Sequence, residues 1–352
     1  MKRKYAVNGL FLTQKVTGIQ RFAYEITKAL DNLFGENELV IVVPAKSDIN
    51  IRFTNIPVVK YGSLQGILWE QINYAYFLKK NKYKAVCLTN VLPLFYRKGI
   101  IAIHDVSYRA NPHFFKGLRN RLSALWHCLN YYAAVHSQMK ILTVSAFSKS
   151  EIQKYYKLES ERIYIVYNAW QHMNDICPSS SLIERYPQLR QREFFFSMAT
   201  MAPNKNVNWI VEAARQHREY MFVIAGSGRF SADMPSNVLF LGYVSDEEAK
   251  ELMSTCKAFI FPTFYEGFGI PPLEAVACGA SQIIVSDTPC LREVYGEYAS
   301  YIDPYKAGEW ITEECKNKNL QELLAKYSWR SSAEAIKQLM EDTDCCSRAA
   351  KV

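Results

Sequence analysis

Residues 258–279 read A-F-I-F-P-T-F-Y-E-G-F-G-I-P-P-L-E-A-V-A-C-G. The apolar, aromatic start favours a buried strand, and the glycines in the middle mark a loop. Pro271 and Pro272 suit the first turn of a helix, where a missing amide hydrogen costs nothing, and Gly279 suits the helix end. The stretch therefore predicts a strand, a loop and a helix in direct succession, which is the unit of an α/β protein with a parallel sheet.

The same alternation of short apolar runs and helical patterns extends along the whole chain. Strand-like runs occupy 5–12, 39–44, 85–89, 100–104, 141–144 and 163–167 in the first half, and 194–198, 221–225, 238–241, 258–261 and 282–285 in the second. Between the two sets, residues 169–190 hold two prolines and three consecutive serines, a composition typical of a linker. Two separate sheets follow, and 352 residues suit two domains of roughly 150 residues each.

Charge is distributed unevenly between the two halves. Residues 1–170 carry 24 Lys and Arg against 10 Asp and Glu, whereas residues 171–352 carry 18 against 24. Unless it is only a solvated basic surface, the first half meets something anionic, such as a membrane, a phosphorylated lipid or nucleic acid. The basic, aromatic stretch 114–139 is compatible with a helix on a bilayer, and equally with a core helix.

The cysteines and the apolar runs indicate the compartment. Nine cysteines without a C-x-x-C pair are typical neither of a disulfide framework nor of a zinc site, and they favour a reducing cytoplasm. The basic start resembles a signal peptide, but the apolar stretch behind it is too short. No run approaches the roughly 20 apolar residues of a membrane span. We expect a cytoplasmic protein whose membrane contact, at the inner face of the cytoplasmic membrane, is peripheral.

The loop ahead of Pro271 is the leading candidate for a ligand site. A helix N-terminus offers unpaired amides and a positive dipole end, which favour a pyrophosphate, and Gly267 and Gly269 let a ligand approach the backbone. Glu266 and Glu274 flank that position, and carboxylates repel phosphate but accept hydrogen bonds from hydroxyls. Both are candidate sugar ligands, although Glu274 alone would also suit a first helical turn as a favourable acid.

The run E-G-F-G-I-P-P-L-E at 266–274 resembles the signature of retaining GT-B glycosyltransferases of family four, the glycosyl transferases group 1. The chain is similar to mannosyl- and rhamnosyltransferases of bacterial polysaccharide clusters. In that family the first glutamate, here Glu266, holds hydroxyls of the donor sugar, and the second, here Glu274, holds the nucleotide ribose. Backbone at three positions would cap the sugar and the phosphates: Phe268, Gly269 and Ile270.

The resemblance implies two Rossmann-like domains that face each other across a cleft, with a C-terminal helix crossing back to the first domain. The segments expected are an N-terminal acceptor-binding domain at 1–170, a linker at 171–190, a nucleotide-sugar-binding domain at 191–327, the C-terminal helix at 328–344 and a tail at 345–352. Only the tail lies outside the resemblance.

Further family positions in the second half follow strands. Lys205 matches the lysine of the family's Arg-Lys pair that grips the diphosphate, whereas Asn204 replaces the arginine. Arg229, after the turn that begins at Gly226, would supply the second cation. Without the family motif, a lone lysine after a strand is normally a solvent-exposed surface residue, and the G-S-G run at 226–228 is normally a turn. Two more residues resemble the family's base-contacting loop at a sheet's carboxyl edge: Tyr243 and Val244.

Two positions in the first half resemble the family's cleft residues. Gly18 opens a helix and matches the first glycine of the family's G-I-G-R loop, which approaches the donor phosphates, with Gln20 in place of the second glycine; an ordinary loop is the alternative. His104 ends a strand and resembles the family's catalytic-cleft histidine, which touches donor sugar and acceptor, although a lone histidine is usually structural. The run at 147–149 is also similar to the family but favours a helix cap.

The resemblance implies a metal-independent reaction that retains anomeric configuration, with His104, Glu266 and Lys205 as the catalytic set. No cofactor or metal is expected, because the one D-x-D triplet, at 342–344, lies far from any predicted strand. Lys205, Arg229 and the helix N-terminus would stabilise the leaving diphosphate.

The expected reaction moves a hexose or deoxyhexose from a nucleotide-diphosphate sugar to a glycan or a polyprenyl-diphosphate-linked glycan, in capsule or O-antigen biosynthesis. Two alternatives stay open. A GT-B sugar-nucleotide epimerase needs no acceptor, and a basic nucleic-acid-binding protein would use the first half, although no recognised nucleic-acid motif is present. The sequence does not identify the base of the donor, the acceptor or the oligomeric state.

Overall fold

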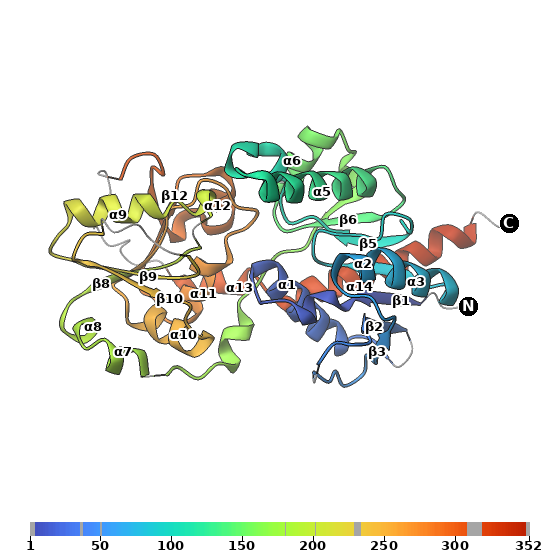
Figure 1. The fold of residues 1–352 in the computed structure, drawn as a ribbon, viewed down its shortest axis with the longest axis horizontal. Helices are drawn as coiled ribbons and strands as arrows, with labels where there is room; N and C mark the ends of the chain where they lie inside the picture. Colours follow the sequence, from blue (N-terminus) through green and yellow to red (C-terminus); the bar gives the residue numbers. More distant parts are fainter. Residues whose placement is uncertain are drawn as a thin grey trace. The chain divides into compact units, whose positions relative to one another are not determined.

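The structure is a computed structural model that describes residues 4–35, 38–49, 51–179, 181–200, 202–228, 234–307 and 319–349, with side chains up to Asp342. The chain divides into two compact units: Met1–Asn168 together with Ser328–Val352, and Ala169–Tyr327 (Figure 1). Residues 171–190, interpreted from composition as a linker, belong to the second unit. They include η5 (Gln171–Asp175) and α7 (Ser181–Arg185), and α8 (Gln188–Gln191) follows.

The first unit is built on a seven-stranded sheet in the order β3-β2-β1-β4-β5-β6-β7, and every pairing is parallel. Its strands are β1 (Tyr5–Asn8), β2 (Leu39–Pro44), β3 (Val58–Tyr61), β4 (Lys84–Cys87), β5 (Gly99–Ala102), β6 (Lys140–Thr143) and β7 (Ile163–Ile165). β1 and β2 are buried along their whole length, as expected of parallel strands covered on both faces. The sequence interpretation did not include β3, an edge strand that is mostly half-buried.

Helices cover both faces of this sheet. One face packs against η2 (Trp69–Tyr74), α3 (Ala75–Asn81), α5 (Leu118–Val135) and α6 (Ala146–Tyr156), which share one core cluster with the strands. Ala6 points into that cluster, so Tyr5 points to the opposite face, because neighbouring strand residues alternate. There the Tyr5 hydroxyl donates to the carbonyl oxygen of Met340 at 2.8 Å. This second face is covered by α1 (Gly18–Asp31) and α14 (Trp329–Ala349).

The last helix of the chain, α14, belongs to the first unit. The Trp329 ring meets the Phe22 ring of α1 at a centroid distance of 6.1 Å, and Lys337 Nζ donates to the carbonyl oxygen of Leu33 at 2.8 Å. Residues 345–349, interpreted as part of a loose tail, continue this helix. Across the described part of the chain, no helix has the length and apolar character needed to cross a membrane.

The second unit holds a six-stranded sheet in the order β10-β9-β8-β11-β12-β13, again parallel throughout. The strands are β8 (Phe194–Met198), β9 (Met221–Ala225), β10 (Val238–Gly242), β11 (Ala258–Phe261), β12 (Ile283–Ser286) and β13 (Ser300–Ile302). Its helices include α9 (Val207–Gln216), α10 (Asp246–Thr255), α11 (Ile270–Ala277), α12 (Pro289–Tyr295) and α13 (Leu320–Ala325). The expectation of two α/β units with parallel sheets is confirmed.

In each sheet the strand order reverses beside the first strand, between β1 and β4 and between β8 and β11. Open α/β sheets bind ligands beyond the carboxyl ends of their strands at such a reversal. Each unit therefore has one edge position where a ligand site is expected.

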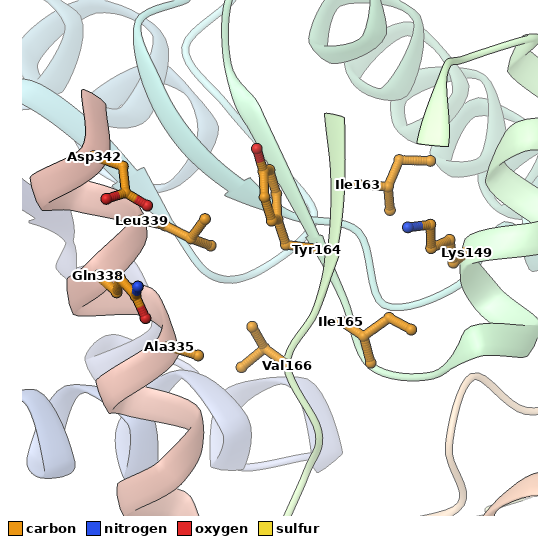
Figure 2. A pocket seen from close by; sticks show the side chains of 9 residues that line it. All are labelled: Lys149, Ile163, Tyr164, Ile165, Val166, Ala335, Gln338, Leu339 and Asp342. Carbon is orange, nitrogen blue, oxygen red and sulfur yellow. The ribbon is translucent and has the colours of Figure 1, made fainter. Parts of the chain in front are cut away.

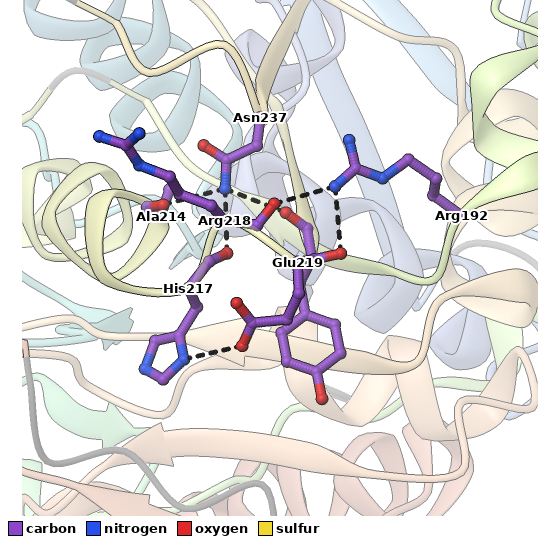
Figure 3. Close-up of polar contacts among 7 residues, drawn as sticks. Arg192, Ala214, His217, Arg218, Glu219 and Asn237 are labelled. Carbon is purple, nitrogen blue, oxygen red and sulfur yellow. Dashed lines mark hydrogen bonds and ion pairs between the residues drawn. The ribbon is translucent and has the colours of Figure 1, made fainter.

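The opposite, amino-terminal edge of the second sheet is closed by side chains that bond backbone carbonyls (Figure 3). Asn237 Nδ2 donates to the carbonyl oxygens of Ala214 and His217 at 2.9 and 3.1 Å, and the Arg192 guanidinium donates to that of Glu219 at 3.1 Å. These bonds satisfy carbonyls left without helical partners after α9. These hydrogen bonds hold the connection between α9 and β9 in place at this edge.

Candidate functional site

Two loops of the second unit meet beyond the carboxyl ends of β8 and β11. The amide nitrogen of Phe264 donates to the carbonyl oxygen of Asn204 at 2.8 Å, and Asn206 Nδ2 donates to that of Pro262 at 2.9 Å. The two loops that flank the reversal of strand order are thus bonded to each other. Side chains that they carry are held at fixed positions over the strand ends.

The loops bring Lys205 and Glu266 into direct contact. Lys205 Nζ lies 2.7 Å from Glu266 Oε1, and it also sits over the Phe261 ring at 5.4 Å from the centroid. The two side chains are 24% and 13% exposed, so the pair is mostly buried but still borders solvent. A cation and a carboxylate side by side suit a ligand that has both phosphate oxygens and hydroxyl groups. The sequence predicted both residues but not their contact.

Glu274 is held by a residue that the sequence interpretation missed. The first turn of α11 contains no acid, so Glu274 lies further along the helix. A favourable interaction with the helix dipole, which needs an acid in the first turn, therefore does not account for Glu274. Its Oε1 is 2.8 Å from Nε2 of His172, a buried residue of η5. The two residues are 102 positions apart, and His172 stands in a segment that reads as a linker. No local pattern in the sequence could have found this pair.

The backbone at the start of α11 is fixed by Gly269. Its φ is +83°, and a Cβ there would lie 2.8 Å from Leu291 Cδ2, so both conformation and packing select glycine. The Tyr295 hydroxyl donates to the Gly269 carbonyl oxygen. The Phe268 ring packs inward against Tyr327 at 5.2 Å between centroids, so this residue can offer a ligand its backbone alone. Two more predicted residues beside Gly269 are also buried: Gly267 and Ile270.

The remaining predicted positions of the second unit differ in environment. A Cβ on Gly226 would lie 1.9 Å from the carbonyl oxygen of Ala199, so the close approach of two strand ends requires glycine there. The Tyr243 side chain, just after β10, is 70% exposed, whereas Val244 is buried. Arg229 lies outside the described residues.

His104 lies just beyond β5, at the carboxyl edge of the first sheet. Its Nε2 is 3.0 Å from the carbonyl oxygen of Leu88, and because that oxygen only accepts, Nε2 carries the proton. Burial lowers the pKa of the His104 ring, which keeps it neutral at pH 7. Its own backbone is held by Asn90 Oδ1, which accepts from its amide at 2.8 Å, and by Ser148 Oγ, which donates to its carbonyl at 2.9 Å. The N-cap of α6 is Ser145, so Ser148 does not cap the helix but holds the backbone of His104 through this hydrogen bond.

Gly18 is the first residue of α1 and is exposed. No side chain of Thr17 caps this helix, and its first turn holds no acid, so its first amides are open to an anion. In the same helix, Phe22 meets the His104 ring edge-on at 4.7 Å between centroids. The structure therefore joins the helix that Gly18 opens to the loop that carries His104.

An open pocket of about 460 Å³ lies elsewhere in the first unit, between the edge strand β7 and α14 (Figure 2). Residues facing it include Tyr164, Val166 and Leu339. None of the predicted sugar- or phosphate-binding residues lines this pocket, so it is separate from the candidate site.

Comparison with known proteins identifies a glycosyltransferase domain in this chain. Residues 182–351 match the family profile described as glycosyl transferases group 1, a stretch that contains Lys205, Glu266 and Glu274. The O-antigen chain mannosyltransferase B of Escherichia coli is 27% identical over 264 residues, covering 69% of this chain and 66% of that protein. The O-antigen chain mannosyltransferase RfbU of Salmonella typhimurium strain LT2 is 27% identical over 281 residues, covering 75% and 73%. The match thus spans just under two thirds of the first relative's length.

A solved structure shares the fold. The structure of Anabaena Alr3699/HepE in complex with UDP-glucose matches with a TM-score of 0.67 and 16% identity, over 98% of this chain and 99% of that one. At that identity the likeness concerns the fold, which is the GT-B fold expected from the sequence. The profile match spans both loops over the second sheet and the helix that carries Glu274, so residues 182–351 of this chain form a glycosyl transferases group 1 domain.

Proposed function

We propose that this chain is a retaining hexosyltransferase that moves a hexose or deoxyhexose from a nucleotide-diphosphate sugar to a glycan, or to a polyprenyl-diphosphate-linked glycan, in surface polysaccharide biosynthesis. The observation that carries the proposal is the Lys205–Glu266 pair at the reversal of strand order. The names of the two O-antigen mannosyltransferases support the polysaccharide context, and the UDP-glucose complex of the Anabaena protein supports a nucleotide sugar as donor.

In the proposed donor complex the second unit holds the nucleotide sugar. Donor binding replaces the Lys205–Glu266 contact, because the lysine turns to a phosphate oxygen and the glutamate accepts from sugar hydroxyls. Glu274 accepts from the ribose hydroxyls, and the backbone amides of Gly269 and Ile270, just ahead of the two prolines of α11, bind the diphosphate. The loop after β10, with Tyr243 and Val244, contacts the base.

Catalysis in this proposal is electrostatic. As the glycosidic bond to the diphosphate breaks, Lys205, Arg229 and the amides of α11 stabilise the charge that develops on the leaving phosphate. The acceptor hydroxyl attacks from the face that the diphosphate leaves, and its proton passes to the leaving phosphate. The sugar thus keeps its anomeric configuration, and neither a metal nor a protein nucleophile takes part.

The first unit binds the acceptor through the loops at the carboxyl edge of its sheet, where His104 lies. A neutral His104 ring, protonated on Nε2, accepts a hydrogen bond at Nδ1 and suits a hydroxyl better than a charged group. In this proposal the protein works at the inner face of the cytoplasmic membrane, which its basic first unit contacts peripherally.

Two substitutions test the site. Lys205→Ala removes the cation that stabilises the leaving diphosphate. Glu266→Gln removes the negative charge of the carboxylate that accepts hydrogen bonds from the sugar hydroxyls. We expect each to lower kcat/KM for transfer by about 10²- to 10³-fold. The matched control is Lys257→Ala, since Lys257 also forms an ion pair, with Glu193, but at the amino edge of the same sheet.

The donor itself is found by thermal stabilisation with UDP-, GDP- and dTDP-sugars, because a ligand that binds the folded state raises the melting temperature with its affinity. Full transfer by Lys205→Ala or by Glu266→Gln would falsify the site assignment. Conversion of the donor without any acceptor would favour an epimerase instead.

A further inference from the structure

Helix α5 carries an apolar stripe on the side that faces away from its sheet. The stripe follows a spacing of four and three residues, which places its members on one side of a helix. Its five side chains are 46 to 76% exposed: Leu118, Leu122, Leu125, Leu129 and Tyr132. The opposite side of α5 is buried as well, with Tyr131 and Ala134 in the core. A helix that is apolar on both sides is normally buried on both sides. We therefore expect a binding partner to bury the α5 stripe.

The apolar surface continues from α5 to the neighbouring η2. Leu92 bonds both elements, because its amide donates to Asn130 Oδ1 of α5 at 3.1 Å and its carbonyl accepts from Gln71 Nε2 of η2 at 3.0 Å. Ile72 of η2 is 53% exposed, and Phe95, in the same loop as Leu92, is 91% exposed. Since both elements cover one face of one sheet, their exposed sides face away from it together.

The charge in this part of the chain is predominantly positive. Residues 49–150 contain 14 Lys and Arg against two acids, Glu70 and Asp105, and Glu70 is buried. On α5, Arg119 and Arg121 are exposed, and at helical spacing they border the stripe on either side. The surface therefore has an apolar centre and a cationic rim.

The apolar centre and the cationic rim together favour one kind of binding partner over others. A second copy of the chain would bring the same cations face to face, at a cost in repulsion. Nucleic acid would meet the cations but offers leucine side chains no apolar partner in its phosphate backbone. An anionic bilayer supplies both acyl chains for the leucines and negative headgroups for the arginines.

We propose that the α5 stripe and its rim form an interfacial docking surface for an anionic lipid bilayer. The leucine side chains enter the boundary between headgroups and acyl chains, while Arg119 and Arg121 stay at the phosphate level. The docking surface follows from the first unit alone; it deepens the proposed function by laying the acceptor-binding unit against the membrane that would carry a lipid-linked acceptor.

The test is co-sedimentation of the full chain with vesicles of phosphatidylcholine, alone or mixed with phosphatidylglycerol. We expect binding to the mixed vesicles that weakens as salt rises. Leu118→Ser/Leu122→Ser/Leu125→Ser should lower the vesicle partition coefficient about tenfold per leucine, because each buried leucine contributes about 1.5 kcal/mol or more. Arg119→Ser/Arg121→Ser should reduce binding to the anionic vesicles and flatten its salt dependence.

The control variant is Lys46→Ser/Ile51→Ser, which removes one exposed cation and one exposed apolar side chain from the connection between β2 and β3. It should bind vesicles like the parent. Equal binding to neutral and anionic vesicles, or unchanged binding by the leucine variant, overturns the proposal. The proposal is also overturned if the chain forms a dimer without lipid and the leucine substitutions dissociate it, because a second copy of the chain would then bury the α5 stripe.

Thermal stabilisation by the nucleotide sugar is measured on the same variants. Lost vesicle binding with unchanged donor stabilisation supports the docking surface and leaves the donor site intact. Normal vesicle binding in a chain that no sugar nucleotide stabilises would instead contradict the proposed function while upholding the docking surface.

Discussion

At the scale of single residues, His172 is the part of the site with the most direct experimental consequence. Its Nε2 and Glu274 Oε1 are 2.8 Å apart, and its ring is buried, so it fixes the carboxylate proposed to bind the ribose. His172 touches no proposed substrate group itself. It acts as a positioning residue, and its loss should be felt in donor binding more than in the chemical step.

We expect His172→Ala to raise the KM for the donor about tenfold or more, because a hydrogen bond to a charged group contributes about 1.5–3 kcal/mol. The kcat at saturating donor should change much less, and steady-state kinetics with varied donor separate the two. His172→Gln, whose Nε2 can donate to the same carboxylate, should restore part of the affinity. A lower melting temperature with an unchanged KM would mean that His172 serves the fold alone.

Residue patterns also mark how far the sequence alone reaches. Lys205, Glu266 and Glu274 were predicted because they match fixed motif positions in segments that follow strands, the first two in loops and Glu274 in α11. His172 was not, because its partner lies 102 positions away and no spacing connects them. Gly269 was chosen for ligand approach, and the structure adds a packing reason, the contact with Leu291 that any Cβ would make.

At the scale of elements, η2 is unusual because it is a π-helix, a rare form that often accompanies functional segments. It carries Glu70 into the core, where Asn8 Nδ2 donates to Oε1 of its carboxyl group. Burial raises the pKa of Glu70 to about 7, against 4.5 for an exposed group. Because the folded state holds this proton more tightly, the resulting stability is complete below pH 4.5 and is lost as the pH rises through 7.

The isostere Glu70→Gln should therefore stabilise the first unit at pH 8, by about 3 kcal/mol, and have little effect near pH 4.5. The amide oxygen still accepts from Asn8, so packing is kept. Urea unfolding of parent and variant at the two pH values measures the difference. Equal stability at pH 8 would show that Glu70 is ionised without cost in the folded chain.

Strand prediction succeeded where burial was complete, and it missed the edge strands β3 and β13, while it included the edge strands β7 and β10. The predicted bounds of β2 and β11 match the structure, since both are continuous apolar runs buried on both faces. The edge strands β3 and β13 are short and partly exposed, and their patterns do not stand out from loops. β1 ends at Asn8, earlier than its apolar run suggests, because the Asn8 side chain caps a 3-10 helix over Gly9–Thr13.

At the scale of the whole molecule, the proposed mechanism assigns the leaving charge to protein groups. Transfer should consequently survive removal of divalent cations, and we expect an unchanged rate in EDTA after extensive dialysis. The measurement is release of the nucleoside diphosphate with and without added Mg²⁺ or Mn²⁺. Loss of transfer in EDTA that either ion restores would contradict the metal-independent mechanism.

The return of α14 to the first unit sets an order of events during synthesis. Trp329, Ile336 and Met340 of this helix are buried, and Met340 accepts from Tyr5 in β1. Of the described helices, only α1 covers that face of the first sheet until α14 has been made. The unit that contains β1 is therefore completed only after residues 169–327 have been made, and nascent chains halted before α14 should need chaperones that shield exposed apolar surface.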